Sequence, residues 1–407
     1  MWIVAPLAVL GAVGAGWLIY RFIVDPIVAD AADAIKLTLA ILTLTGAVLA
    51  GVYAYRKQRI AESDAHRADA NQFADRYTTA AGQLGHDKAA VRLAGVYALA
   101  RLADDWEEQR QVCIDVLCAY LRMPYQTNPN ANGYKEGERE VRHTIIRLIR
   151  DHLRLAPTHP HSWQGCDFDF TAVSFDGGDL SGAVFSGGTV SFTRAEFTGG
   201  TVSFNRATVS GGTVDFRRAA FSGGLVSFDR AMFSGGTVNF NRATFSGGRI
   251  SFDGAKFSGS TVGFAAATFS GGTVGFDDAV FSGGTVNFGG ATLSSTFILV
   301  RFNRAAFSGG AVSFQDAMFS GGLVSFDGAA FSGGLVRFNE ATFSDGLIRF
   351  NDATFSNGLV SFDGVTLSGG SVDLRSVASW ATPPRFDDGV SGNPPTGLLL
   401  PSPVVGS

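Results

Sequence analysis

The amino-acid sequence predicts a mainly β protein, in which a solenoid of short strands follows two membrane helices and a small α-helical region. Three observations lead to this fold class. A Phe- and Gly-rich pattern of 12 residues fills much of the second half of the 407 residues, two N-terminal runs carry no charge, and amphipathic segments lie between them. Gly (52 residues) and Phe (35 residues) are more frequent than an ordinary mixed core requires, which is typical of a repeat array.

The first element is a two-helix membrane anchor, expected over residues 1–57. Met1 to Tyr20 and Leu37 to Tyr55 contain no charged side chain, and each is close to the ~20 residues that a helix needs to cross a bilayer. A cleaved signal peptide is the alternative for the first run, but this run lacks a basic start and a second apolar run follows it. The lipid bilayer is therefore the expected partner of residues 1–55.

Basic residues predict the orientation of this anchor. Arg56, Lys57 and Arg59 directly follow the second span, whereas acidic residues predominate between the two spans. Because basic residues stay on the cytoplasmic side, both termini are expected in the cytoplasm. The predicted localisation is the cell membrane, multi-pass, with the repeat region in the cytoplasm.

Residues 58–164 are expected to form a helical stalk and a small helical domain. Gln58 to Tyr77 is polar and Ala-rich, and it continues the second membrane helix as a solvated helix rather than a coiled coil. His86 to Leu99 resembles the first part of a HEAT-type helical hairpin, although Gly95 stands where that family usually has Ala. Because one such unit cannot form a stable solenoid, a small helical bundle is the preferred interpretation.

Residues 138–155 are predicted to form an amphipathic helix with an apolar side and a basic side. The basic residues are Arg139, Arg142, Arg147, Arg150 and Arg154. Two roles fit this pattern: binding to anionic lipid headgroups, or covering the open end of the solenoid with a solvated outer face. The covering role is preferred because a charged helix face is usually a solvated one.

The repeat array is expected over residues 165–376, with the pattern A-x-F-S-G-G-x-V-x-F-x-x and one insertion near Thr296 and Phe297. Large apolar residues recur in steps of five and seven, and a smaller apolar residue lies two positions before each. Side chains two positions apart share one face of a strand, whereas no helix keeps these spacings on one face. The pattern therefore predicts short strands that turn corners, with Gly-Gly pairs supplying a positive φ at the wider corners.

The segment Asp179-Leu180-Ser181-Gly182-Ala183 resembles the pentapeptide-repeat family, whose register is A-(D/N)-(L/F)-(S/T)-x. This resemblance implies a right-handed, four-sided β-solenoid with stacked inward side chains. Every second side is two residues longer than in the family, so two of the 12-residue patterns would make one four-sided coil, and the array would contain about nine coils. The expected caps are residues 138–155 with Trp163 at one end, and Leu374, Val377 and Trp380 at the other. Residues 377–407 are Pro-rich and are predicted to be a disordered tail.

No sequence motif indicates an active site. Phosphate-binding loops, H-E-x-x-H and G-x-S-x-G are absent. His159, His161 and Cys166 are close together, but a polar linker explains them better than a metal site, and Cys113 and Cys118 do not share a helix face. No catalytic, cofactor-binding or metal-binding residue is predicted, and the protein is expected not to be an enzyme.

Two sets of polar residues are expected on the outside of the solenoid. The first set follows a Phe in alternate sides and is expected to solvate a corner: Asn205, Asp229, Asp253 and Asp277. The second set falls on one ladder if two patterns make one coil: Thr189, Thr213, Thr237, Thr261 and Thr285. Threonine ladders resemble those of ice-binding solenoids, but such ladders also stabilise sheets, and a cytoplasmic location argues against ice.

The predicted function is a membrane-anchored repeat scaffold or protein–protein interaction module with an unknown protein partner. The family resemblance supplies an alternative, a gyrase-interacting protein that mimics duplex DNA. Residues 165–376 contain 17 acidic and 13 basic side chains, whereas a duplex carries about one negative charge per 1.7 Å of axis. The rod is therefore poorly suited to mimicry, and the whole-chain charge of −4 gives no reason to expect a nucleic-acid partner. A homo-oligomer formed end to end or through the stalk is left open.

Overall fold

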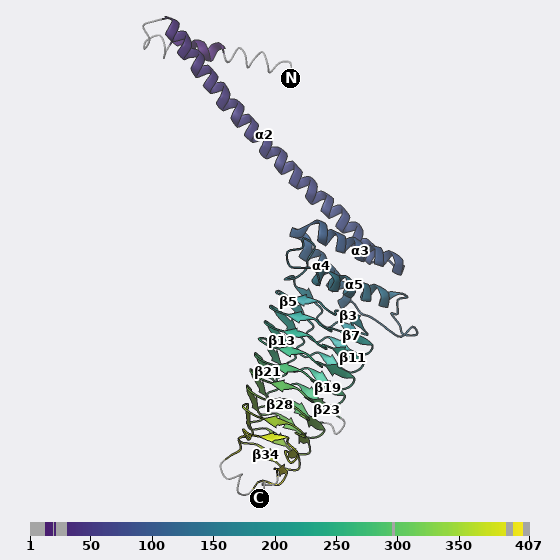
Figure 1. Ribbon diagram of the computed structural model, residues 1–407. Coiled ribbons are helices and arrows are strands. Elements are labelled where there is room, and N and C mark those ends of the chain that lie inside the picture. The colour runs from purple at the N-terminus through teal and green to yellow at the C-terminus, as the bar shows by residue number, and fades with distance from the viewer. Residues whose placement is uncertain (1–12, 19, 22–30, 295–297, 388–393, 402–407) are drawn as a thin grey trace. The chain divides into compact units, whose positions relative to one another are not determined.

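The computed structural model describes residues 13–18, 20–21, 31–294, 298–387 and 394–401 (Figure 1). The chain divides into two compact units, Met1–Asp75 and Arg76–Ser407. Helix α2 (Ala31–Leu84) contributes to both units, and the solenoid lies entirely in the second.

Helix α2 is a single helix of 54 residues that contains both the second expected membrane span and the expected stalk. Its segment Ile35–Leu84 is long and apolar enough to cross a membrane, with a mean hydropathy of 1.9 in its most apolar window. Large apolar side chains such as Leu44 and Leu49 are exposed in this segment, which is the pattern expected of a helix that contacts lipid.

One helix of the described residues passes this test, where two spans were predicted. Most of the first span, Met1 to Tyr20, lies outside the described residues. The part that is described, residues 13–18, is helical, and a Cβ at Gly16 would lie 3.0 Å from Leu42 Cδ1. This close approach is the packing expected of a small residue between two apolar helices.

Three further helices form the predicted small bundle: α3 (Ala89–Asp105), α4 (Arg110–Arg122) and α5 (Glu138–Leu153). A short 3-10 turn, Glu107–Gln109, separates the first two. Gly95 of α3 faces the end of α2, where a Cβ would lie 2.8 Å from both Ala80 O and Leu84 N. The close contact between the two helices leaves no room for a Cβ at this position.

The repeat region forms four parallel sheets, which we name A to D after the order in which the chain visits them. Sheet A contains β1 (Phe168–Asp169), β5 (Thr189–Ser191), β9 (Thr213–Asp215), β13 (Thr237–Asn239), β17 (Thr261–Gly263), β21 (Thr285–Asn287), β25 (Ala311–Ser313), β29 (Leu335–Arg337) and β33 (Leu359–Ser361). Sheet B contains β2 (Ser174–Phe175), β6 (Glu196–Phe197), β10 (Ala220–Phe221), β14 (Thr244–Phe245), β18 (Thr268–Phe269), β22 (Thr292–Leu293), β26 (Met318–Phe319), β30 (Thr342–Phe343) and β34 (Thr366–Leu367).

The other two sheets complete the four sides of the coil. Sheet C contains β3 (Gly178–Asp179), β7 (Thr201–Ser203), β11 (Leu225–Ser227), β15 (Arg249–Ser251), β19 (Thr273–Gly275), β23 (Leu299–Arg301), β27 (Leu323–Ser325), β31 (Leu347–Arg349), β35 (Ser371–Asp373) and β37 (Leu398–Leu399). Sheet D contains β4 (Val184–Phe185), β8 (Thr208–Val209), β12 (Met232–Phe233), β16 (Lys256–Phe257), β20 (Val280–Phe281), β24 (Ala306–Phe307), β28 (Ala330–Phe331), β32 (Thr354–Phe355) and β36 (Ser379–Trp380).

The strand register gives the length of each coil. Phe197 pairs with Phe221 and Thr213 with Thr237, so partners in the central coils are separated by 24 positions, which is two of the 12-residue patterns. The separation increases to 26 where the insertion falls, as in the pairing of Val280 with Ala306. Nine or ten strands a sheet at ~4.8 Å spacing make a stack roughly 40 Å long, as the four-sided solenoid of about nine coils predicted.

Columns of aromatic rings fill the interior of the solenoid. Phe240, Phe264 and Phe288 stack nearly parallel, with ring centroids 4.8 and 4.6 Å apart. The column beneath sheet C meets this one edge to face, as between Phe264 and Phe252 at 6.1 Å. Small buried Ala and Val side chains, such as Ala267 and Val262, fill the space between rings. This packing buries a large apolar area in a narrow rod.

The prediction of a disordered tail after residue 376 is wrong for the described part of that segment. Ser379 and Trp380 pair with β32, and Leu398 pairs with Val372 of β35. Phe386 extends a column of rings by stacking on Phe362 at 5.3 Å. The segment closes the last coil because its apolar side chains cover rings that would otherwise be exposed to water.

Candidate interaction surface

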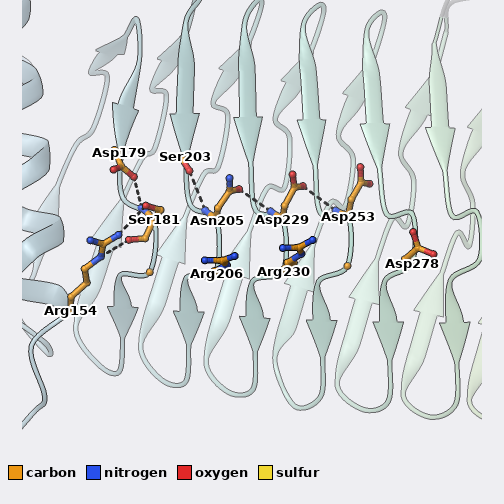
Figure 2. A pocket seen from close by; sticks show the side chains of 12 residues that line it. Arg154, Asp179, Ser181, Ser203, Asn205, Arg206, Asp229, Arg230, Asp253 and Asp278 are labelled. Carbon is orange, nitrogen blue, oxygen red and sulfur yellow. Dashed lines mark hydrogen bonds between the residues drawn. The ribbon is translucent and has the colours of Figure 1, made fainter.

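The Asn and Asp residues that follow a Phe lie on the outside of the solenoid, and they border a groove near α5. The groove has a volume of about 740 Å³, and the side chains beside it include Arg154, Asn205, Asp229 and Asp253 (Figure 2). It is an open trough over successive coils rather than an enclosed cavity. Its polar residues come from the corner between sheets C and D.

The Asn and Asp residues of this groove connect one coil to the next. The Oδ1 atoms of Asn205 and Asp229 each accept the backbone N–H of the residue 24 positions later, both at 3.2 Å (Figure 2). Asp253 Oδ1 accepts the N–H of Asp277 in the same way, at 3.0 Å. Ser227 and Ser251 donate their hydroxyl protons to the first two of these oxygens. The expectation that these side chains only solvate a corner is therefore wrong, because they satisfy backbone donors of the adjacent coil.

Two acids of this ladder lie close to the same arginine. Arg301 Nε lies 3.1 Å from Asp277 Oδ2, and Arg301 also reaches Asp253 at 4.0 Å. Burial raises the pKa of the Asp277 carboxyl; Arg301 lowers it and Asp253 raises it, and the net direction is upward. The acids of the ladder are thus occupied within the fold, by arginine and by backbone donors.

The two tight corners of each coil end in a residue with left-handed backbone conformation. We call the corner between sheets A and B the AB ridge: Ala172, Arg194, Arg218, Arg242, Ala266, Gly290, Asp316, Glu340 and Gly364. The CD ridge is the corner between sheets C and D: Gly182, Arg206, Arg230, Gly254, Asp278, Arg304, Gly328 and Asp352. Their φ values range from 55° to 72°.

Sequence reasoning missed these ridges. It predicted positive φ for the Gly-Gly corners, where Gly224 and Gly236 have φ values of 70° and 69°. At the tight corners an Arg, Asp or Glu adopts the same conformation at a cost of about 1–2 kcal/mol relative to the right-handed region. No residue type signals this position, and only its recurrence before an Ala, twice in each coil, could have identified it.

The comparisons with known proteins agree with this architecture. A family model described as pentapeptide repeats (9 copies) matches residues 170–220. The chain carries pentapeptide repeats. No curated protein and no solved structure matches the chain significantly. Pentapeptide-repeat solenoids are generally structural or interaction proteins, and the matched family is not a catalytic one.

The helical bundle closes the first coil of the pentapeptide-repeat solenoid through Asp176. Tyr125 Oη and Arg139 Nε donate to Asp176 Oδ2 at 2.9 Å each, and His143 Nε2 lies 3.0 Å from Oδ1. Burial by itself would raise the pKa of Asp176, but these three partners outweigh it and hold the pKa well below its usual range. The carboxylate is therefore charged at neutral pH and attaches the bundle to the solenoid.

The basic side of α5 faces the solenoid as well. Arg150 pairs with Asp179, and Arg154 Nε donates to Ser181 O at 2.7 Å. Arg142 is buried and donates to Leu121 O at 2.6 Å. The expected covering role of this helix agrees with these contacts, but the expected solvated basic face does not, because several of its arginines bind the first coil.

Among the described residues, the histidines that follow α5 and the two cysteines of α4 do not assemble into a metal site. The rings of His159 and His161 meet edge to face at 5.3 Å, and His161 Nδ1 lies 3.8 Å from Asp104. Burial raises the pKa of Cys113 to about 11 and that of Cys118 to about 12, so both thiols stay protonated at neutral pH. Within the described residues, no group of three or more metal-binding side chains comes together.

Proposed function

We propose that this protein is a membrane-anchored, non-catalytic interaction scaffold whose pentapeptide-repeat solenoid presents its outer ridges to a protein partner in the cytoplasm. One observation carries the proposal: the interior is a closely packed stack of buried rings, whereas charged side chains recur on two outer ridges at a fixed spacing. A regular surface without a reactive group is suited to binding rather than to catalysis.

Helix α2 supports the membrane anchor in this proposal. Its apolar segment ends just before Arg56, Lys57 and Arg59, and the polar segment that follows leads to the bundle. Basic residues that follow a span favour the cytoplasmic side. The two-span hairpin and the cytoplasmic solenoid are parts of the proposal for that reason.

The gyrase-binding alternative receives less support from the ridges. A protein that mimics a duplex needs dense negative charge along one face. Arg194, Arg218 and Arg242 instead form a positive column on the AB ridge, and Arg206 and Arg230 do so on the CD ridge. The expected result of a supercoiling assay with the full chain is no inhibition of gyrase.

The proposed location of the solenoid on the cytoplasmic side of the membrane is tested by cysteine labelling in intact cells. Thr261→Cys places an exposed thiol on sheet A. A membrane-impermeant maleimide should label it only after the cells are permeabilised, and the wild-type chain controls for labelling of its own three cysteines. Labelling of intact cells would place the solenoid outside and contradict the proposal.

Partner binding is tested by photo-crosslinking in living cells with the full chain. A crosslinking amino acid is placed singly at one exposed position on each sheet: Thr261, Thr268, Arg249 and Lys256. The proposal expects discrete protein adducts from one or two of the four faces, because a partner covers only part of the surface. The absence of any adduct, or equal diffuse labelling from all four faces, would contradict a specific scaffold.

A further inference from the structure

The AB ridge carries charges that the fold leaves unpaired. Its three arginines, Arg194, Arg218 and Arg242, occupy adjacent coils, and its acids are Asp316 and Glu340. All five side chains are exposed, and none forms an ion pair or a side-chain hydrogen bond with another described residue. Like charges that stack in adjacent coils repel one another, so this arrangement destabilises the isolated chain unless something else contacts it.

The CD ridge shows that pairing within a ridge is possible. Arg304 lies one coil after Asp278 and binds it with two hydrogen bonds, of 2.8 and 2.7 Å. Both ridges have the same backbone conformation, so the difference lies in the order of the charges. Opposite charges occupy adjacent coils on the CD ridge, whereas the AB ridge separates its bases from its acids.

Within the segment of the AB ridge from Arg194 to Gly364, the order of charges is complementary to its own reverse. Arg218 is second from one end and Glu340 is second from the other. Arg242 and Asp316 are third from their respective ends. The two residues in the middle, Ala266 and Gly290, are uncharged and small.

We infer that the AB ridge binds the AB ridge of a second copy of this chain, antiparallel and about a two-fold axis between Ala266 and Gly290. Arg218 then faces the partner's Glu340, and Arg242 faces the partner's Asp316. A two-fold contact repeats each pair, so four ion pairs form about the axis. The small central residues allow the two backbones to approach there.

The geometry of the solenoid keeps this register along the whole ridge. Each ridge residue donates its N–H to the next coil, as from Ala266 to Gly289 O and from Gly290 to Gln315 O, both at 2.9 Å. Both copies therefore have the same spacing between charges, about 4.8 Å a coil. The insertion at 295–297 follows β22 and precedes β23, so it falls on a different corner from the AB ridge.

One further feature agrees with this register. The carboxylate of Glu340 lies over Gly364, where a Cβ would be 2.6 Å from Glu340 Cδ. This position lets it reach the partner copy's Arg194 as well as its Arg218.

A parallel pair would have the opposite electrostatics. It would place Arg218 against Arg218 and Glu340 against Glu340, which adds repulsion. Anionic lipid would satisfy the arginines but not Asp316 or Glu340. The segregation of both signs on one ridge therefore favours a second, antiparallel copy. This inference concerns the solenoid alone and does not depend on the proposed membrane anchor.

Charge reversal with rescue tests the inference in the full-length protein in detergent. Arg218→Glu and Glu340→Arg are each expected to raise the dimer dissociation constant by at least ~10-fold, because each breaks two ion pairs and adds two repulsions. The double variant restores both pairs in the antiparallel register and should return to within about threefold of the wild-type value. Mass photometry or sedimentation over a range of concentrations measures the constant.

Folding of these variants is not at risk from the backbone, because Glu340 already occupies the same left-handed conformation that Arg218 does. Arg304→Glu on the CD ridge is the matched control, and it should leave the dimer constant unchanged. A wild-type monomer at every concentration, or a double variant as weak as the single ones, would overturn the inference. The inference would also be overturned if the wild-type chain is monomeric and binds vesicles of anionic lipid, and if Arg218→Glu abolishes that binding.

Discussion

The interior columns and the AB ridge are built on the same spacing of one residue per coil, yet they differ in how freely their residues vary. Along one interior column, Phe192 to Phe362, every position is a buried Phe. Along the AB ridge, the same coils present Arg, Ala, Gly, Asp and Glu with nearly the same φ. Packing determines the interior residue, whereas it leaves the ridge residue open. The order of residues on the ridge is therefore where a binding function can be encoded.

The largest expected effect comes from removing an interior ring. Phe264 is 0% exposed and stacks between Phe240 and Phe288. Phe264→Ala should lower the free energy of unfolding by about 3–5 kcal/mol, because it removes buried apolar area and leaves a cavity. Denaturant unfolding followed by far-UV circular dichroism measures this. Phe264→Leu is the control, with an expected loss of about 1–1.5 kcal/mol; equal losses would contradict the role of ring stacking.

A smaller effect is expected at the Gly-Gly corners. Gly248 has a φ of 70°, and a Cβ there would lie 2.5 Å from Gly224 O. Gly248→Ala should cost about 2–4 kcal/mol from backbone strain together with overpacking. Gly290→Ala on the AB ridge is the matched control, because its φ is 63° but no atom lies within 4 Å of the added Cβ. It should cost only about 1 kcal/mol, and equal losses at both sites would show that the corner contact is unimportant.

The contact between bundle and solenoid should depend on pH. The pKa of Asp176 is lowered in the folded protein, so its contribution to stability is present above the unfolded pKa of about 3.9 and is lost as the pH falls through the folded value. Asp176→Asn should lower stability at pH 7 by about 1–2 kcal/mol and make the loss of stability below about pH 5 less steep. Thermal unfolding at several pH values measures both, and parallel acid profiles for variant and wild type would contradict this assignment.

The smallest stability effect is expected on the ridge itself. Arg218→Gly removes an exposed side chain at a position where Gly adopts the backbone conformation without strain. The free energy of unfolding should change by no more than about 0.5 kcal/mol, measured at a concentration at which the wild-type chain is monomeric. A loss as large as that of Phe264→Ala would mean that the ridge stabilises the coil, and the comparison between ridge and interior would fail.

The coil could be predicted from the sequence because Phe is usually buried and Gly readily adopts positive φ. Their steps of five and seven predicted short strands that turn corners, with positive φ at Gly-Gly corners. The resemblance to pentapeptide repeats then implied a four-sided coil made of two patterns. The ridges were missed because Arg, Asp and Glu do not signal a left-handed conformation. The tail was missed because its Pro-rich composition masked Phe386, which lies one coil after Phe362 and continues its column. The contacts of Asp176 join segments far apart in the chain, which no local pattern indicates.

The central claim is that the outer ridges, and not the interior, carry the function. The most direct test is affinity capture from native membranes of the tagged full-length chain, co-expressed with a differently tagged second copy. The test variant replaces the charged AB ridge residues by Gly: Arg194, Arg218, Arg242, Asp316 and Glu340. The account predicts that this variant keeps its fold but loses the second copy, whereas Phe264→Leu retains it. Equal recovery by the ridge variant and the wild type would contradict the account.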